Sequence, residues 1–383
     1  MALRMNAIAQ RPLHIVHVAS GDLWAGAEVQ LFHLVVELNR DAATRVTVIV
    51  LNPGLLEQRL REAGVAVVVL DERRLRSLRL LTEVVAEIRR LRPDVVHTHR
   101  LKENVLGSIA AAFAGCRSLR TVHGAEEFAF TPWQLHKRMY RWLDQWCGRV
   151  LQQAVVAVSP MLAQQLKRRY PSVSAIENGI DIDTLERQQS AIVPLPGPPD
   201  SIRVAFVARL VPVKRVDVFV EIAAQTIAAD PRFHFYLLGD GPLAGWVRDA
   251  IATRDLAERV HLLGFKDPLA PYLAKMDIML ITSDHEGLPM NLLEAMALQI
   301  PIVAHAVGGI PAALENGACG TLLNRLEPAD YVATMLAYRN APDALRAKAR
   351  RARTRVAQHY ASTVCAERYR DLYRVLHDAT HGR

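Results

Sequence analysis

Residues 277–314 read DIMLITSDHEGLPMNLLEAMALQIPIVAHAVGGIPAAL. Two short apolar runs, at 277–283 and 301–307, flank a loop and a helix-length segment that opens near Pro289. Apolar runs bounded by polar, glycine and proline residues are typical of parallel strands that are buried on both faces. Similar strand and helix segments alternate along the rest of the chain, so we predict an α/β fold built from doubly wound sheets.

The alternation is interrupted once. The segment QQSAIVPLPGPPDS holds four prolines between Pro194 and Pro199, and neither a helix nor a central strand can run through it. We therefore predict two domains, over residues 1–190 and 200–360, with a ligand cleft where the carboxyl ends of their strands face each other. The expected strands are LHIVHVA, RVTVIVL, VAVVVL, DVVHTH, SLRTVH and AVVAVS in the first domain, and RVAFVARL, FHFYLLGDG, RVHLLGF, DIMLITS and PIVAHAV in the second.

The composition is that of a globular enzyme, because 51% of the 383 residues are hydrophobic and only 22% are charged. The longest apolar runs are far shorter than the ~18 to 20 residues that cross a membrane. The opening MALRMNAIAQRP lacks the apolar core of a signal peptide, so we expect a cytoplasmic protein. The spacing of Cys116, Cys147, Cys319 and Cys365 suits neither a disulfide scaffold nor a metal site, so we expect reduced packing residues.

Positive charge is concentrated in the first half of the chain. Residues 1–195 hold 25 Lys and Arg against 19 Asp and Glu, whereas the rest holds 22 against 20. This favours an anionic partner such as a membrane surface or a phosphorylated acceptor, although a solvated basic face is an equal alternative; no nucleic-acid partner is expected. Segment 133–146 could dock on a membrane, but core packing is the favoured interpretation of its apolar stripe, which comprises Leu135, Met139, Trp142, Leu143 and Trp146.

Two acids in residues 277–314 are candidate ligand-binding groups. Glu286 lies in the loop after the first strand, and Glu294 lies eight residues later in the helix. The first N–H groups of that helix lack intrahelical partners and suit a phosphate oxygen. Two carboxylates so placed can accept hydrogen bonds from two diols, one on a sugar and one on a ribose. An ordinary loop acid and a solvated helix acid are the alternatives.

Basic and glycine-bearing turns follow other strands. Arg209 and Lys214 could neutralise a diphosphate whose charge grows as its bond to a sugar breaks, although both could be simple surface cations. The turn at Gly239 could bring backbone close to a ligand, and the turn at 20–30 could form part of a diphosphate or acceptor pocket. His123 also ends a strand, but a lone histidine is usually structural.

A metal site is not predicted. His97 and His99 are expected to point to opposite faces of their strand, which makes them a poor metal pair. Asp181 and Asp183 form an Asp-x-Asp pair, but they lie in the segment NGIDID and are interpreted as structural.

Taken in order, these motifs resemble glycosyltransferase family 4, the large retaining GT-B family. The resemblance spans nearly the whole chain and is most specific in NGID (178–181), ARLVPVKRVD, GDGPL, VHLLGF, HEGLPMNLLEAMA and GGIPAAL. It implies a GT-B fold, with two Rossmann-like domains facing across a cleft and the C-terminal helix at 362–383 completing the first domain.

The resemblance also implies roles for single residues. Arg209 and Lys214 would hold the donor diphosphate, Glu294 would bind the ribose, and Glu286 would contact the transferred sugar. His123 would face the reacting sugar. The family often has two glycines before its Ala-Glu pair, whereas this chain has Ala25 and Gly26. The remaining donor-binding candidates are Gly26, Gly239, Gly264, Gly287, Leu288, Pro289, Met290 and Asn291.

The implied reaction is retaining transfer of a sugar from a nucleotide-diphosphate donor, a UDP-sugar first and a GDP-sugar next, to a glycan or lipid-linked acceptor. No tightly bound cofactor or metal is expected. The implied setting is cell-surface polysaccharide or oligosaccharide assembly at the inner membrane face. The alternatives are a non-catalytic nucleotide-sugar-binding scaffold subunit and a GT-B relative such as an epimerase or a phosphorylase. A dehydrogenase is disfavoured because no dinucleotide fingerprint follows the first strand.

Overall fold

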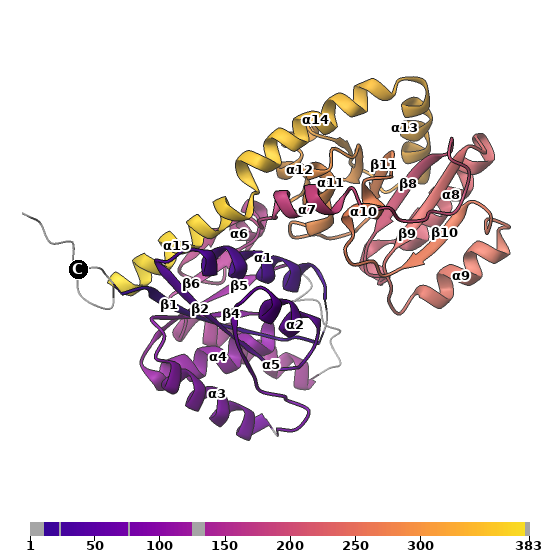
Figure 1. Cartoon of the computed structure of the whole chain (residues 1–383). Coiled ribbons are helices and arrows are strands. Elements are labelled where there is room, and N and C mark those ends of the chain that lie inside the picture. Colours follow the sequence, from indigo (N-terminus) through magenta and orange to yellow (C-terminus); the bar gives the residue numbers. More distant parts are fainter. Residues whose placement is uncertain (1–10, 23, 76, 125–134, 380–383) are drawn as a thin grey trace, which may run out of the picture.

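Two parallel sheets organise the computed structural model, which describes residues 11–22, 24–75, 77–124 and 135–379 (Figure 1). The first has the order β3-β2-β1-β4-β5-β6-β7 and the second the order β10-β9-β8-β11-β12-β13. These are the predicted doubly wound sheets, so the fold class is confirmed. The strands are β1(Leu13–Ala19), β2(Thr44–Val50), β3(Ala66–Val69), β4(Val95–His99), β5(Arg117–Val122), β6(Ala154–Ala157), β7(Val173–Ala175), β8(Ile202–Val207), β9(Phe233–Leu238), β10(Val260–Gly264), β11(Ile278–Ile281), β12(Ile302–His305) and β13(Thr321–Leu323).

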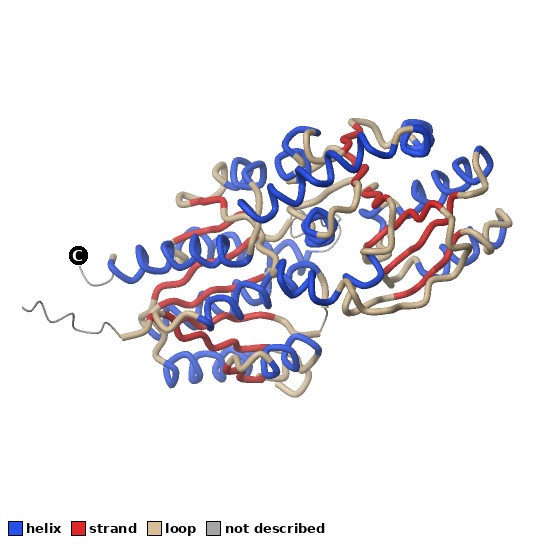
Figure 2. The backbone as a smooth tube through the Cα atoms, turned by 45° about the horizontal axis from the view of Figure 1, so that its top comes forward, coloured by secondary structure: helices blue, strands red, loops and turns tan. Residues whose placement is uncertain are grey.

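Helices cover both faces of each sheet (Figure 2). In the first half they are α1(Gly26–Arg40), α2(Leu55–Glu62), α3(Ser77–Leu91), α4(Leu101–Ala114), α5(Leu135–Val150), α6(Pro160–Leu166) and α7(Ile182–Gln188). In the second half they are α8(Val216–Ala229), α9(Ala244–Thr253), α10(Ala270–Leu273), α11(Met290–Ala297), α12(Ile310–Ala313), α13(Pro328–Asn340), α14(Pro342–His359) and α15(Ser362–Asp378), with 3-10 turns at Pro212–Lys214 and Glu315–Gly317.

The alternation of side chains along β1 explains why its sequence is almost continuously apolar. Ile15 and Ala19 pack with residues of α1 and α15 on one face, whereas Val16 and Val18 pack with residues of α3 and α4 on the other. All four side chains are almost fully buried. A strand covered on both faces needs apolar residues at both parities, as the sequence pattern predicted.

The last two helices return the chain from the second sheet to the first (Figure 1). Helix α14 packs against α11, and α15 packs against α1 and β4. The NGID segment lies at this crossing, where Ile180 pairs with Ala361. A Cβ on Gly179 would lie only 2.9 Å from Ser362 Cα, so the crossing requires glycine there. We propose residues 1–190, completed by the C-terminal helix at 362–383, as the first domain and 200–360 as the second.

The favoured interpretation of the apolar stripe on α5 is wrong for three of its members. The exposed fractions of Met139, Trp142 and Trp146 are 68%, 65% and 41%, while Leu143 is half-buried. The α5 stripe, defined here as Met139, Trp142, Trp146 and the 58% exposed Val150, therefore lies on the surface. The side chain of Leu135 is outside the described residues. Within the part of the chain that the structure describes, no helix is long and apolar enough to cross a membrane.

The cysteines have the predicted character. All four are free thiols, and Cys147, Cys319 and Cys365 are buried.

Candidate active site

Loops from the two sheets meet at the carboxyl ends of β5 and β11. A Cβ on Gly287 would lie 2.2 Å from the backbone oxygen of His123, so the two loops touch through their main chains. A Cβ on Gly26 would lie 3.9 Å from Met290 Cγ. The structure therefore brings together Gly26 and His123 from the first half and residues 287–290 from the second.

Lys214 and Glu286 form an ion pair beside this contact. Lys214 Nζ lies 2.6 Å from Glu286 Oε1, and the Ser283 hydroxyl donates to the same oxygen at 2.7 Å. The Thr282 hydroxyl donates to the Lys214 carbonyl at 3.0 Å and anchors the lysine-bearing turn to the end of β11. An anion that enters the site would compete with Glu286 for the ammonium group. Both residues were predicted to lie in loops that follow strands, but their pairing was not predicted.

Side-chain amides fix the entry into α11. Asn291 donates to the carbonyl of Val207, and Asn178 Nδ2 donates to the carbonyl of Leu288 at 2.7 Å. Pro289 precedes the helix in an extended conformation, so the first N–H groups of α11 point out of the helix start. Asn178 was missed as a site residue, although the NGID motif that contains it is visible in the sequence.

A second group of predicted residues surrounds the turns after β9 and β10. Gly239 N donates to Gly264 O at 2.9 Å, and a Cβ on Gly239 would lie 1.8 Å from Ala208 O. Burial raises the pKa of Glu294 to about 7, and the negative charge of Asp267 adds to this effect. Glu294 therefore lies in a poorly solvated place near the turn that follows Gly264.

Arg209 is not part of the Lys214–Glu286 contact. Its side chain is exposed at the end of β8, and among the described residues no carboxylate pairs with it. The neighbouring Leu210 N donates to Asp240 O at 2.9 Å, which ties this strand end to the turn at Gly239. The predicted cation is thus available to a ligand, but the structure does not join it to Lys214.

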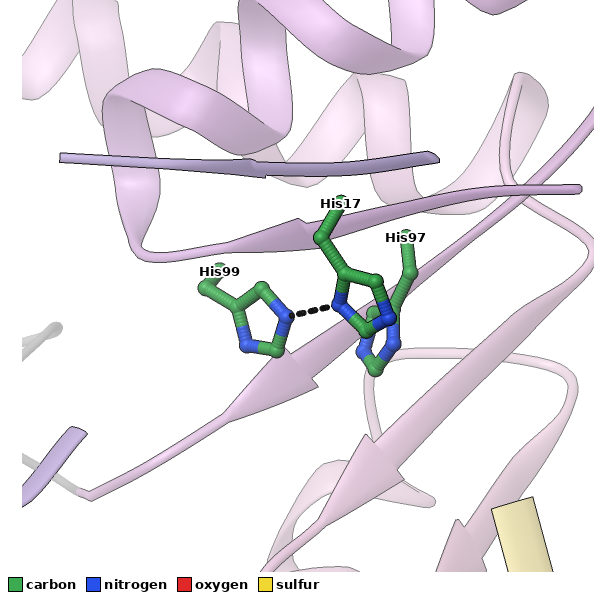
Figure 3. A group of neighbouring side chains, drawn as sticks. All are labelled: His17, His97 and His99. Atoms are coloured by element: carbon green, nitrogen blue, oxygen red, sulfur yellow. Dashed lines mark hydrogen bonds between the residues drawn. The ribbon is translucent and has the colours of Figure 1, made fainter. Parts of the chain in front are cut away.

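The prediction that His97 and His99 point to opposite faces is wrong. Residues two apart on a strand lie on the same face. Ring nitrogens of His17, His97 and His99 lie within 4.8 Å of one another (Figure 3). His97 Nδ1 hydrogen-bonds to the Tyr373 hydroxyl and His97 Nε2 to the Thr121 hydroxyl, each at 2.7 Å. Both nitrogens of His97 are therefore occupied by side-chain partners, and the absence of a metal site stays a prediction.

Buried acids line the first-half side of the site. Glu28 is 3% exposed, and its Oε1 lies 2.6 Å from Arg100 Nη2. Its Oε2 accepts a hydrogen bond from the backbone N–H of Ala25 at 3.2 Å. Burial raises the pKa of Glu28, while Arg100 opposes that shift. Glu103, in α4, accepts a hydrogen bond from the hydroxyl of Ser20, which follows β1. Sequence reasoning assigned no role to these residues, although Ala27 and Glu28 form the Ala-Glu pair of the motif.

Family models match both halves of the chain. The model described as Glycosyltransferase Family 4 matches residues 24–184, and the one described as Glycosyl transferases group 1 matches residues 201–340. The chain belongs to glycosyltransferase family 4. This agrees with the resemblance of its motifs.

Curated relatives of this glycosyltransferase match it in part. It is 27% identical over 264 residues to the UDP-Gal:alpha-D-GlcNAc-diphosphoundecaprenol alpha-1,3-galactosyltransferase of Escherichia coli, covering 65% of this chain and 67% of the relative. It is 35% identical over 129 residues to the amylovoran biosynthesis glycosyltransferase AmsK of Erwinia amylovora, covering 32% of each chain. The matched region spans about two thirds of the length of the Escherichia coli relative and about a third of the length of AmsK.

Solved structures confirm the GT-B fold of this family 4 member. HepE of Anabaena in complex with UDP-glucose has a TM-score of 0.80 at 19% identity, covering 95% of this chain and 100% of that one. Sucrose-phosphate synthase of Thermosynechococcus elongatus has a TM-score of 0.77 at 17% identity, covering 96% of this chain and 100% of that one. At these identities the likeness concerns the fold.

Proposed function

We propose that this glycosyltransferase moves a sugar from a nucleotide-diphosphate donor to a glycan or lipid-linked acceptor, with retention of the anomeric configuration. The observation that carries the proposal is the Lys214–Glu286 ion pair in the loop before α11, whose next residue, Gly287, lies against the His123 backbone. A UDP-sugar is the favoured donor and a GDP-sugar the next. The Escherichia coli relative is named for UDP-Gal and a diphosphoundecaprenol-linked sugar, and the HepE complexes hold UDP, alone or with glucose, or UDP-glucose, which supports this choice.

The chemistry follows from where charge develops. As the bond from the sugar to the diphosphate breaks, negative charge grows on the leaving diphosphate. The Lys214 ammonium and the first N–H groups of α11 would stabilise that charge, and the exposed Arg209 would add a second cation. Glu286 would accept hydrogen bonds from hydroxyls of the transferred sugar, and Glu294 would accept them from the ribose. Basic groups and a helix start would thus assist departure of the leaving group.

Replacing Lys214 or Glu294 by alanine tests whether these side chains bind the nucleotide-sugar donor. We expect Lys214→Ala to lower kcat/KM for the nucleotide sugar roughly 30-fold, since a hydrogen bond to a charged group contributes about 2 kcal/mol. Glu294→Ala should weaken use of the donor in the same direction. Steady-state kinetics with UDP-sugars and GDP-sugars measure both effects, and thermal unfolding shows whether the variants stay folded.

The exposed Lys167 on the first domain supplies a matched control. Lys167→Ala should keep wild-type kinetics. If Lys214→Ala and Glu294→Ala both kept wild-type turnover as well, the assigned donor site would be wrong.

We propose that the first domain, which would bind the acceptor, contacts an anionic membrane surface. The α5 stripe presents two exposed tryptophans and two aliphatic side chains on the more basic half of the chain. Tryptophan favours the interface between water and lipid, and basic residues are attracted to anionic headgroups. Arg149 is exposed on the same helix next to Val150. This arrangement would bring a lipid-linked acceptor to the first domain.

Vesicle sedimentation tests the membrane contact. The double variant Trp142→Ser with Trp146→Ser is expected to lose about tenfold in binding to vesicles that contain phosphatidylglycerol, because two large apolar anchors are removed. Trp246→Ser is the control, since Trp246 is similarly exposed, at 43%, but lies on α9 in the second domain. Equal sedimentation of the double variant and the control, or no binding by the wild type at low salt, would contradict the contact.

A further inference from the structure

A chain of imidazoles leads from His123 into the first sheet. His123 Nε2 lies 3.2 Å from His99 Nδ1, and His99 Nε2 lies 3.1 Å from His17 Nδ1. Figure 3 shows the inner of these two hydrogen bonds. His17 is 0% exposed and His99 is 3% exposed. His123 directly follows β5, His99 is the last residue of β4, and His17 lies in β1. These three strands are neighbours in the sheet.

The proton positions along this chain are coupled. Burial lowers the pKa of His17 and of His123 to about 3, and it lowers the pKa of His99 well below the usual value. Each ring is therefore neutral near pH 7, with one N–H donor and one lone pair. One ring must donate and the other accept in each hydrogen bond. Two arrangements satisfy both bonds: all three rings carry the proton on Nδ1, or all three carry it on Nε2.

The two ends of the chain decide between these arrangements. His17 Nε2 and His123 Nδ1 are buried and have no hydrogen-bond partner among the described residues. With protons on Nε2, the interior would hold an unpaired N–H at His17, and buried N–H groups without partners are rare in native proteins. His97 lies beside His17 with ring centroids 4.7 Å apart and tilted ring planes, but both nitrogens of His97 already have partners. The Nδ1–H arrangement leaves only a lone pair at the fully buried His17 and moves the unpaired N–H to His123, which is half-buried and lies at a strand end beside the loop that carries Gly287.

We propose that His99 and His17 are positioning residues that hold His123 in its Nδ1–H form, so that His123 donates a hydrogen bond to an oxygen of the donor sugar. The proposal rests on the proposed function, because it takes His123 to face that sugar. The unpaired Nδ1–H is a donor at the meeting point of the two domains, where Gly287 touches the His123 backbone. A sugar oxygen would supply the acceptor that this group lacks.

Nitrogen NMR on protein labelled with ¹⁵N-histidine tests the tautomer directly. We expect the wild type to show His123 with a protonated Nδ1 and an unprotonated Nε2. In His17→Leu the inner donor is lost, so His123 should show a mixture of the two tautomers. In His17→Asn the amide can replace the Nδ1–H donor, so the Nδ1–H form should return. A wild-type His123 protonated on Nε2 would overturn the proposal even if neither variant folds.

Kinetics provide a second readout. His17→Leu is expected to lower kcat about tenfold while leaving the affinity for UDP unchanged, because the nucleotide does not contact His123 in this scheme; His17→Asn should recover most of the loss. An unchanged kcat in a folded His17→Leu would overturn the proposal. The two proposals can fail separately. If His123 shows the expected tautomer but the protein transfers no sugar, the proposed function is wrong. If sugar is transferred but His123 is protonated on Nε2, the tautomer proposal is wrong.

Discussion

Replacement of Gly287 by alanine is expected to lower kcat/KM by at least about 100-fold. The added Cβ would lie 2.2 Å from the His123 backbone oxygen and 3.0 Å from Val158 Cγ2. A backbone oxygen cannot rotate aside, so the loop that carries Glu286 must move away from His123. A displacement of about 1 Å between reacting groups can cost about 100-fold in rate. Steady-state turnover of a nucleotide sugar and an acceptor measures the loss.

Gly245→Ala is the matched control for this change. A Cβ on Gly245 would meet no atom within 4 Å, and the residue lies in α9. Alanine is favoured over glycine in a helix by about 1 kcal/mol, so this variant should keep wild-type activity and unfold at the same or a slightly higher temperature. Turnover of Gly287→Ala near the wild-type value would mean that the two loops do not meet during the reaction.

The long strands could be predicted because both of their faces are buried. LHIVHVA was expected as a strand, and β1 covers the same residues, Leu13–Ala19. The short strands β7(Val173–Ala175) and β13(Thr321–Leu323) were not predicted. Each lies at the edge of its sheet and none of its residues is fully buried, so no apolar run marks it. These two strands are defined by their hydrogen bonds to a neighbouring strand, and the sequence pattern alone does not reveal that pairing.

The site was predictable in its parts and not in its pairings. Lys214 and Glu286 were predicted to lie in loops that follow strands, but the 2.6 Å contact between Lys214 Nζ and Glu286 Oε1 depends on the adjacency of β8 and β11, which are far apart in sequence. The period of two along β4 puts His97 and His99 on the same face of the sheet, so this proximity follows from the sequence. The α5 stripe shows a different limit, because an apolar helix face does not reveal whether another element covers it.

Acidification is expected to destabilise the protein through its buried histidines. The pKa values of His17 and His123 are lowered to about 3, and those of His97 and His99 are well below the usual value, all through burial. Their unfolded-state pKa is about 6.5. Below that value the unfolded chain binds protons that the native chain does not, so stability is present above pH 6.5 and is lost as pH falls. Each such group contributes at most about 1.4 kcal/mol per pH unit as the pH falls below 6.5.

Buried acids act in the opposite direction. The pKa of Glu294 is raised to about 7, and burial also raises the pKa values of Glu28, Glu103 and Asp144, so the native chain gains protons at these acids before the unfolded chain does, which offsets part of the histidine effect. Urea denaturation at several pH values between 7 and 5 measures the slope of the unfolding free energy. His97→Gln can keep side-chain contacts to Tyr373 and Thr121 but cannot titrate, so the slope should decrease by about 1.4 kcal/mol per pH unit, the contribution of one proton. An identical slope in wild type and His97→Gln would mean that His97 is not held neutral in the native sheet. Burial would then not be enough to keep the neighbouring rings of His17 and His99 neutral, and the coupled tautomers require neutral rings.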